Sequence, residues 1–69
     1  MTPKRFNVGK FHAMLDQRRT ALGMDWKQVA QETGVTAATL TRMGQGKKPD
    51  ADNLARLCWW TGFNLRDFV

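Results

Sequence analysis

Apolar residues recur at helical spacing over most of the chain, and polar or glycine signals divide this pattern into short pieces. The first piece predicts a helix over residues 8–22, with Asn7 as its N-cap and Gly23 as its end. Phe6 stands before the cap and Phe11 four residues after it, which is the spacing of a hydrophobic staple. The inner face of this helix carries four apolar side chains: Val8, Phe11, Leu15 and Leu22.

Two shorter helices follow, with a very short connection between them. Asp25 begins the first, Gln28 stands at the capping-box position, and Gly34 ends the helix. Thr36 comes only two residues later and is a favourable N-cap for the next helix. So short a turn makes the helices cross steeply and requires a residue that tolerates positive φ, which Gly34 supplies. The pattern predicts a helix-turn-helix over approximately 26–44.

The second helix of this pair has two faces of different chemistry. Leu40 and Met43 face inward. The outer face carries small side chains and one long hydrogen-bond donor: Ala37, Ala38, Thr41 and Arg42. A helix with such a face fits a DNA major groove, which is about 12 Å wide.

The rest of the chain predicts one loop and two further helices. Residues 44–49 form a glycine-rich basic loop. Asp50 caps a fourth helix that runs to Thr61 and ends at Gly62, and Asn64 caps a last short helix. The prediction is therefore an all-α fold of five helices without strands.

Length and composition exclude several classes of protein. The chain has 69 residues, 42% of them apolar, which fits a single domain over 1–69. Cys58 is the only cysteine and His12 the only histidine, so neither an internal disulfide nor a zinc-finger ligand set is possible. No apolar run approaches the roughly 20 residues that cross a membrane. We expect a cytoplasmic protein without metal, cofactor, membrane association or enzymatic activity.

The charge is positive and unevenly distributed. Eleven Lys and Arg stand against six Asp and Glu, a net charge of +5. Residues 1–22 carry +4, residues 23–49 carry +2 and residues 50–69 carry −1. This distribution favours a polyanionic partner at the first two-thirds of the chain, although a solvated basic surface is an alternative. Lys4, Arg5 and Lys10 form either an N-terminal arm on that partner or a frayed terminus.

Three segments of the chain resemble one family of DNA-binding proteins. The sequences VAQETGVT (29–36), TLTR (39–42) and GK (46–47) are similar to those of the phage repressor and Cro family, also called XRE-type. The resemblance covers most of the chain. It implies a five-helix, lambda-repressor-like domain of bacterial or phage origin that binds double-stranded DNA and regulates transcription, typically as a repressor.

The resemblance also implies roles for individual residues. Base contacts are expected from the start and outer face of the third helix, at Thr36, Ala37, Ala38, Thr41 and Arg42. Arg42 can bind guanine through two hydrogen bonds, although near a helix C-terminus it also complements the helix dipole. Phosphate contacts are expected from Trp26, Lys27, Gln45, Lys47 and Lys48.

Two positions depart from the family pattern. Trp26 stands where relatives have a glutamine that binds phosphate, and its indole either donates one bond to phosphate or packs over the first helix. Gly44 stands where relatives have a glutamate that pairs with the residue matching Arg19. Arg19 must then reach solvent or another acceptor such as a loop carbonyl, and a bolder hypothesis frees it for phosphate binding.

Aromatic residues gather near the end of the chain. Adjacent positions of a helix diverge by about 100°, so at least one of Trp59 and Trp60 is expected to be exposed. We expect a homodimer through Trp59, Trp60 and Phe63 that presents two recognition helices about 34 Å apart. Alternatively, the second tryptophan covers the edge of the core. A competing function is a protein-interaction module on the same fold, which docks a partner through the Trp59 and Trp60 surface without binding DNA.

Overall fold

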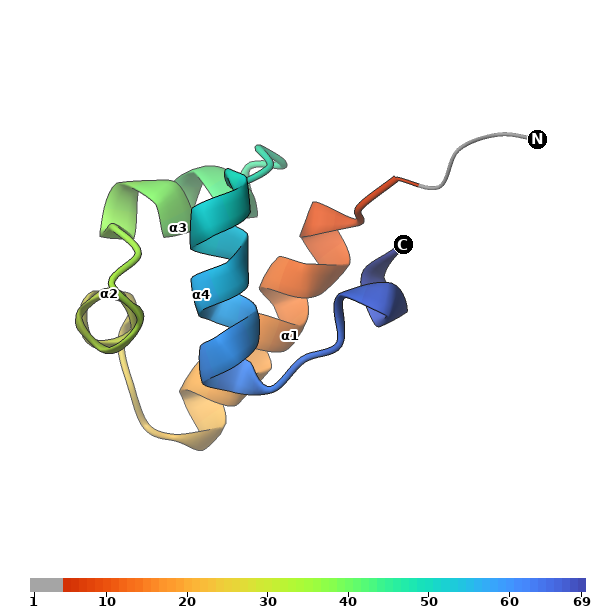
Figure 1. Cartoon of the computed structure of the whole chain (residues 1–69). Helices are drawn as coiled ribbons and strands as arrows, with labels where there is room; N and C mark the ends of the chain where they lie inside the picture. The colour runs from red at the N-terminus through yellow and green to blue at the C-terminus, as the bar shows by residue number, and fades with distance from the viewer. Residues whose placement is uncertain (1–4) are drawn as a thin grey trace.

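A computed structural model describes residues 5–69 (Figure 1). In this part of the chain there are four α-helices, one 3-10 helix and no strand. Their bounds are Val8–Ala21 (α1), Trp26–Thr33 (α2), Ala37–Gly44 (α3), Ala51–Thr61 (α4) and Leu65–Phe68 (η1). The predicted all-α class is confirmed, but the count of five helices is not, because the last element is a single 3-10 turn. Its cap, Asn64, accepts the backbone N–H of Arg66, a two-residue link that favours a tight turn.

Side-chain caps begin the four α-helices at the predicted residues. Each cap accepts the backbone N–H of the residue three positions on: Asn7, Asp25, Thr36 and Asp50. The capping box of α2 is complete, since the Gln28 side chain also accepts the N–H of Asp25. Gly34 ends α2 with a left-handed φ of 78°. Helices of only eight residues are marginal alone, so α2 and α3 depend on these caps and on packing.

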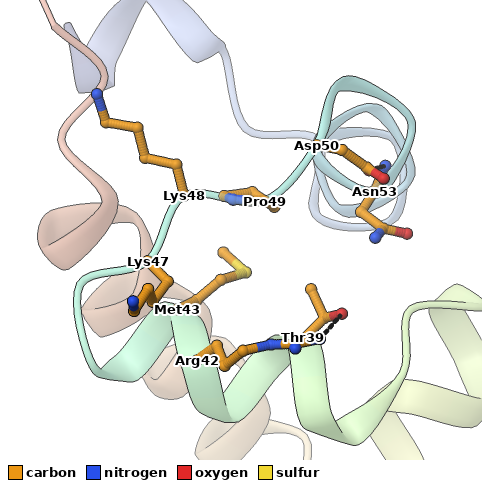
Figure 2. Close-up of a pocket in the computed structure, with 8 residues that line it drawn as sticks. All are labelled: Thr39, Arg42, Met43, Lys47, Lys48, Pro49, Asp50 and Asn53. Atoms are coloured by element: carbon orange, nitrogen blue, oxygen red, sulfur yellow. Dashed lines mark hydrogen bonds between the residues drawn. The ribbon is translucent and has the colours of Figure 1, made fainter.

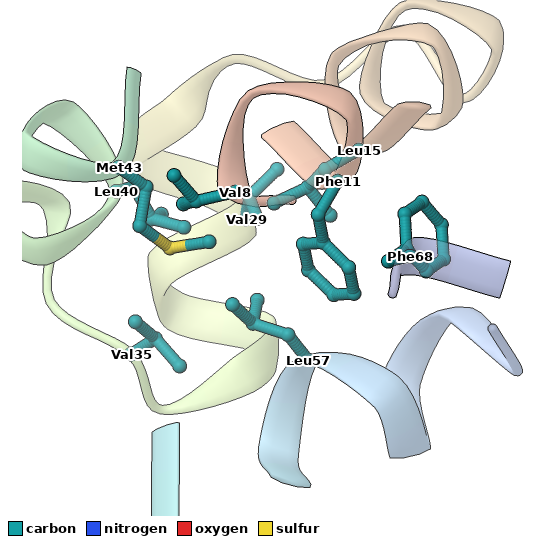
Figure 3. Close-up of a cluster of buried hydrophobic side chains, with 9 residues drawn as sticks. All are labelled: Val8, Phe11, Leu15, Val29, Val35, Leu40, Met43, Leu57 and Phe68. Atoms are coloured by element: carbon teal, nitrogen blue, oxygen red, sulfur yellow. The ribbon is translucent and has the colours of Figure 1, made fainter. Parts of the chain in front are cut away.

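One hydrophobic core joins all five elements (Figure 3). Phe11 and Leu15 of α1 are fully buried, and side chains from every other element point toward them. The core consists of Val8, Phe11, Leu15, Val29, Val35, Leu40, Met43, Leu57 and Phe68. Leu22 does not belong to it, contrary to the predicted inner face, because it follows the last turn of α1 as the C-cap and is 54% exposed.

A phenylalanine cluster ties the start of α1 to the end of the chain. The ring of Phe11 meets Phe6, Phe63 and Phe68 at centroid distances of 5.4, 5.8 and 4.9 Å, all edge to face. The backbone N–H of Asn7 donates to the carbonyl oxygen of Phe68 at 2.6 Å. The staple predicted between Phe6 and Phe11 is therefore confirmed, and η1 packs beside α1 (Figure 1).

Candidate nucleic-acid interface

Helix α3 lies across one side of the domain with its polar face turned outward. Figure 1 shows α2 nearly end-on and α3 running across the view, so the two helices cross steeply at the turn. Leu40 and Met43 are each 1% exposed and fix the inner face. The residues predicted to contact bases are all exposed: Thr36, Ala37, Ala38, Thr41 and Arg42. Neighbouring elements therefore do not cover the predicted recognition face.

The side chain of Arg42 lies along the outside of α3 (Figure 2). Its Nη2 donates to the hydroxyl oxygen of Thr39 at 3.5 Å, and the Thr36 hydroxyl donates to the same oxygen at 2.9 Å. A hydrogen bond of 3.5 Å on an exposed surface is weak. Arg42 is thus held near the outer face of α3 by a contact that a stronger acceptor displaces at little cost.

A basic groove adjoins this face, between the C-terminal half of α3 and the start of α4 (Figure 2). It has a volume of about 300 Å³ and is lined by Thr39, Arg42, Met43, Lys47, Lys48, Pro49, Asp50 and Asn53. Three cations against one carboxylate give the groove a positive balance. Lys47 and Lys48 are exposed, as are two further residues predicted to contact phosphate, Gln45 and Lys27.

Trp26, also predicted to contact phosphate, packs over α1. The indole is half-buried and stacks on His12, with ring centroids 4.9 Å apart and planes inclined by 17°. The guanidinium carbon of Arg19 lies 5.0 Å from the centre of the indole ring. Of the two alternatives for Trp26, the structure shows the packed arrangement.

Arg19 donates hydrogen bonds to two residues that are near it in the sequence. Its Nη1 donates to the carbonyl oxygen of Met24 at 2.8 Å. Its Nε and Nη2 donate to Oδ1 of Asp16 at 2.9 and 2.6 Å. The prediction that Arg19 finds a loop carbonyl is confirmed, and the guanidinium is engaged rather than free for phosphate.

The sequence pattern did not connect His12 with Gly44, which the structure brings together. A Cβ atom added to Gly44 would lie 3.1 Å from Cε1 of His12 and 3.2 Å from Nε2. A side chain at position 44 would therefore press against the imidazole, and the ring would have to move by a few tenths of an ångström. A cavity of about 230 Å³ opens beside it, lined by His12, Trp26, Leu40, Thr41 and Gly44. In the sequence, His12 and Arg19 are seven residues apart, which places them on one face of α1. This spacing does not indicate that His12 meets Gly44.

The three residues predicted for a dimer interface differ in exposure. Trp59 is 85% exposed, which confirms that at least one tryptophan faces solvent. It lines a shallow groove of about 400 Å³ together with Thr33, Ala55 and Arg56. Trp60 and Phe63 are half-buried and pack against the core. Only Trp59 is therefore freely available to a partner.

The predicted N-terminal arm lies partly outside the described residues, which begin after Lys4. Lys10 belongs to the fold, since its Nζ donates to the carbonyl oxygen of Asp67 at 3.0 Å. Its ammonium also lies 5.6 Å from the centre of the Phe68 ring. Lys10 is thus held against η1 rather than extended in an arm.

Other chemistry is sparse in residues 5–69. Cys58 is half-buried, and burial raises the pKa of its thiol. Within this range, no cluster of His, Cys, Asp or Glu is arranged to hold a metal ion. The described helices are all too short or too polar to cross a membrane.

Comparison with models of protein families gives a match. A family model described as the Cro/C1-type HTH (helix-turn-helix) DNA-binding domain matches residues 14–69. The matched region holds all of α2, α3, α4 and η1 and more than half of the chain. Searches of curated proteins and of solved structures find no match.

Proposed function

The chain belongs to the Cro/C1-type helix-turn-helix DNA-binding family, and we propose that it regulates transcription by placing α3 in the major groove of duplex DNA. One observation carries this proposal: α3 buries Leu40 and Met43 and leaves Thr41 and Arg42 exposed beside a basic groove. A face of small side chains allows close approach to the bases. The net charge of +5 favours the polyanion.

The exposed residues at the start and outer face of α3 read the base sequence in this proposal. Arg42 leaves its weak contact with Thr39 and binds O6 and N7 of a guanine, worth about 1–3 kcal/mol of discrimination. Ala37 and Ala38 present methyl groups that fit against the methyl group of thymine. Thr36 and Thr41 supply hydroxyl groups to base edges or to phosphate.

The residues around α3 bind the DNA backbone. Lys47 and Lys48 extend from the loop before α4, and Gln45 donates a neutral bond from the end of α3. Lys27 lies on the first turn of α2 and is exposed, next to Trp26, which packs over α1. Such contacts fix the register of the protein on DNA but are insensitive to base sequence.

The regulator is of the repressor or Cro type and binds as a homodimer in this proposal. Two recognition helices about 34 Å apart match two half-sites one helical turn apart. Trp59 supports the dimer, because its indole is 85% exposed beside a groove and offers apolar surface that a second copy can cover. The half-buried Trp60 and Phe63 contribute their outer edges. Sedimentation with and without duplex DNA tests this step, and a monomer in both conditions contradicts it.

The same exposed Trp59 favours a second candidate function, in which the domain docks another protein and does not bind DNA. The dependence of affinity on salt separates the two functions. If each copy contacts about 5–8 phosphates, log affinity falls against log salt with a slope near −0.9 for each phosphate. Lys47→Ala reduces the magnitude of that slope by about 0.9 for each bound copy, whereas Arg66→Ala, on η1, leaves it unchanged. Affinity for duplex DNA that does not vary with salt contradicts the proposed function.

A further inference from the structure

Three side chains from α1 and α2 form a stack that reaches the end of α3. We call His12, Trp26 and Arg19 the indole stack. His12 and Arg19 are seven residues apart, which separates them by about 10.5 Å along the axis of α1. The indole lies 4.9 Å from the imidazole and 5.0 Å from the guanidinium carbon. Trp26 therefore contacts two side chains of α1, and these contacts hold the start of α2 against α1.

The far end of the indole stack is anchored as well. Arg19 donates two hydrogen bonds to Asp16, one turn earlier on α1, and one to the carbonyl oxygen of Met24 in the turn before α2. With three of its N–H groups engaged, the guanidinium has little freedom to move away from the indole. The stack is thus braced on α1 and on the turn that leads into α2.

Gly44 marks where the stack meets α3. Glycine is a poor helix former, and its use is normally explained by positive φ. Gly44 lies in the last turn of α3 and is absent from the four glycines of residues 5–69 that have positive φ. The imidazole of His12 comes so close to Gly44 that an added Cβ would lie 3.1 Å away, and the ring would have to move by a few tenths of an ångström to accept it.

We infer that His12 is a positioning residue for DNA binding, which seats the last turn of α3 at a set distance from α1. The inference rests on the proposed function and deepens it. Leu40 and Thr41 line the same cavity as His12 and Gly44. A movement of the imidazole therefore also changes the packing of α3 one turn before Gly44. Thr41 and Arg42 lie on that turn and are exposed, so their approach to the bases depends on the position of α3 that His12 sets.

A double-mutant cycle on His12 and Gly44 tests this packing. In the wild-type background, Gly44→Ala presses its Cβ against an imidazole that is already stacked on Trp26, so we expect a lower thermal midpoint and a lower affinity for the preferred duplex. In the His12→Ala background the same change meets no ring, so the gain in helix propensity raises the thermal midpoint. We expect His12→Ala alone to weaken binding by about fivefold, and the two substitutions to be non-additive by a similar factor.

Two further variants separate positioning from general loss of stability. His12→Phe retains a flat ring on the indole, and we expect its affinity to stay within about twofold of wild type. Phe6→Leu weakens the phenylalanine cluster and lowers the thermal midpoint. At a temperature where every variant is folded, we expect Phe6→Leu to bind DNA as wild type does and His12→Ala to bind more weakly.

The outcomes distinguish this inference from the function on which it rests. If wild-type protein shows no salt-dependent binding to duplex DNA, the proposed function fails and the positioning role fails with it. If wild type binds but folded His12→Ala binds equally well, only the positioning role is overturned. A lower thermal midpoint for Gly44→Ala in the His12→Ala background as well overturns the packing argument, because the strain then does not come from the imidazole.

Discussion

Helix α1 carries two aromatic clusters that differ in composition and in what they connect. The phenylalanine cluster contains only hydrocarbon side chains, and Phe11 and Phe68 at its centre are at most 1% exposed. The indole stack next to it is half-buried and includes a histidine, an arginine and a bonded carboxylate. The first joins α1 to η1 at the ends of the described chain, whereas the second joins α1 to α2 and to the last turn of α3.

The difference predicts that the stability of the domain and its affinity for DNA depend on different clusters of side chains. Each apolar side chain removed from the phenylalanine cluster costs burial and leaves a cavity, without altering the face that we propose meets DNA. A change in the indole stack costs less, because its side chains remain partly hydrated, but it moves α2 and α3, the two helices of the proposed DNA interface. We therefore expect variants of the two clusters to fall into two classes, one defined by unfolding and the other by affinity.

The largest effect is expected within the phenylalanine cluster. Phe11 is fully buried and contacts three other rings, so Phe11→Ala lowers the free energy of unfolding by about 3–5 kcal/mol. Urea denaturation measures the change. Leu22→Ala, at a leucine that is 54% exposed, is the control and changes the stability by less than about 1 kcal/mol. Equal losses for the two variants would contradict the core described above.

Arg42→Ala produces the largest effect on recognition. It removes the proposed donor to guanine, so we expect discrimination at one base pair to fall by about 1–3 kcal/mol while other positions keep their preferences. Competition with duplexes that each carry one altered base pair measures this profile. Lys47→Ala is the matched variant at a phosphate contact and weakens all duplexes by a similar factor. Indistinguishable profiles for the two variants would show that Arg42 does not read a base.

The N-caps offer a smaller, paired comparison. Asn7 caps α1 beside the phenylalanine cluster, and Asp25 caps α2 beside the indole stack. Replacement of either by alanine lowers the free energy of unfolding by about 1 kcal/mol. With both variants fully folded, only Asp25→Ala reduces DNA affinity, because it loosens the start of α2. Thermal unfolding and duplex titration measure the two quantities, and equal affinities for both variants would remove the distinction between the two regions.

The smallest effect concerns Cys58, which lies in neither cluster. Burial raises the pKa of its thiol, so the folded protein favours the neutral form. Its contribution to stability is fully present below the thiol pKa of the unfolded chain and is lost as pH rises through the higher folded value. Alkylation near pH 8 is accordingly slower for the folded protein than for the protein in urea. A faster reaction of the folded protein would contradict the assignment.

Local signals in the sequence predicted most of the architecture. A cap and the residue that it bonds lie within three positions, so Asp25 with Gln28 and the turn at Gly34 were recognisable without knowledge of the fold. The same holds for the inner positions Leu40 and Met43, whose periodicity is a property of one helix. The error at Leu22 arose because periodicity does not say where the last helical turn ends.

Features that depend on contacts between helices were not predictable. The placement of Trp26 on α1 remained one of two alternatives, since an indole fits both a phosphate and a packed site. The contact between His12 and Gly44 joins positions 32 residues apart, and no local rule connects them. Only the arrangement of α1, α2 and α3 showed that the imidazole of His12 lies next to Gly44, where an added Cβ would contact the ring.

Selection of bound duplexes from a random pool tests the central claim most directly, because it requires no assumption about the target site. If the outer face of α3 reads the major groove, the pool becomes enriched in one motif that contains a guanine whose enrichment is lost with Arg42→Ala. For a dimer the motif is repeated with two-fold symmetry at a separation of about 10–10.5 base pairs. A pool that retains its starting composition after repeated rounds, for wild type as for Arg42→Ala, would contradict sequence-specific recognition by α3.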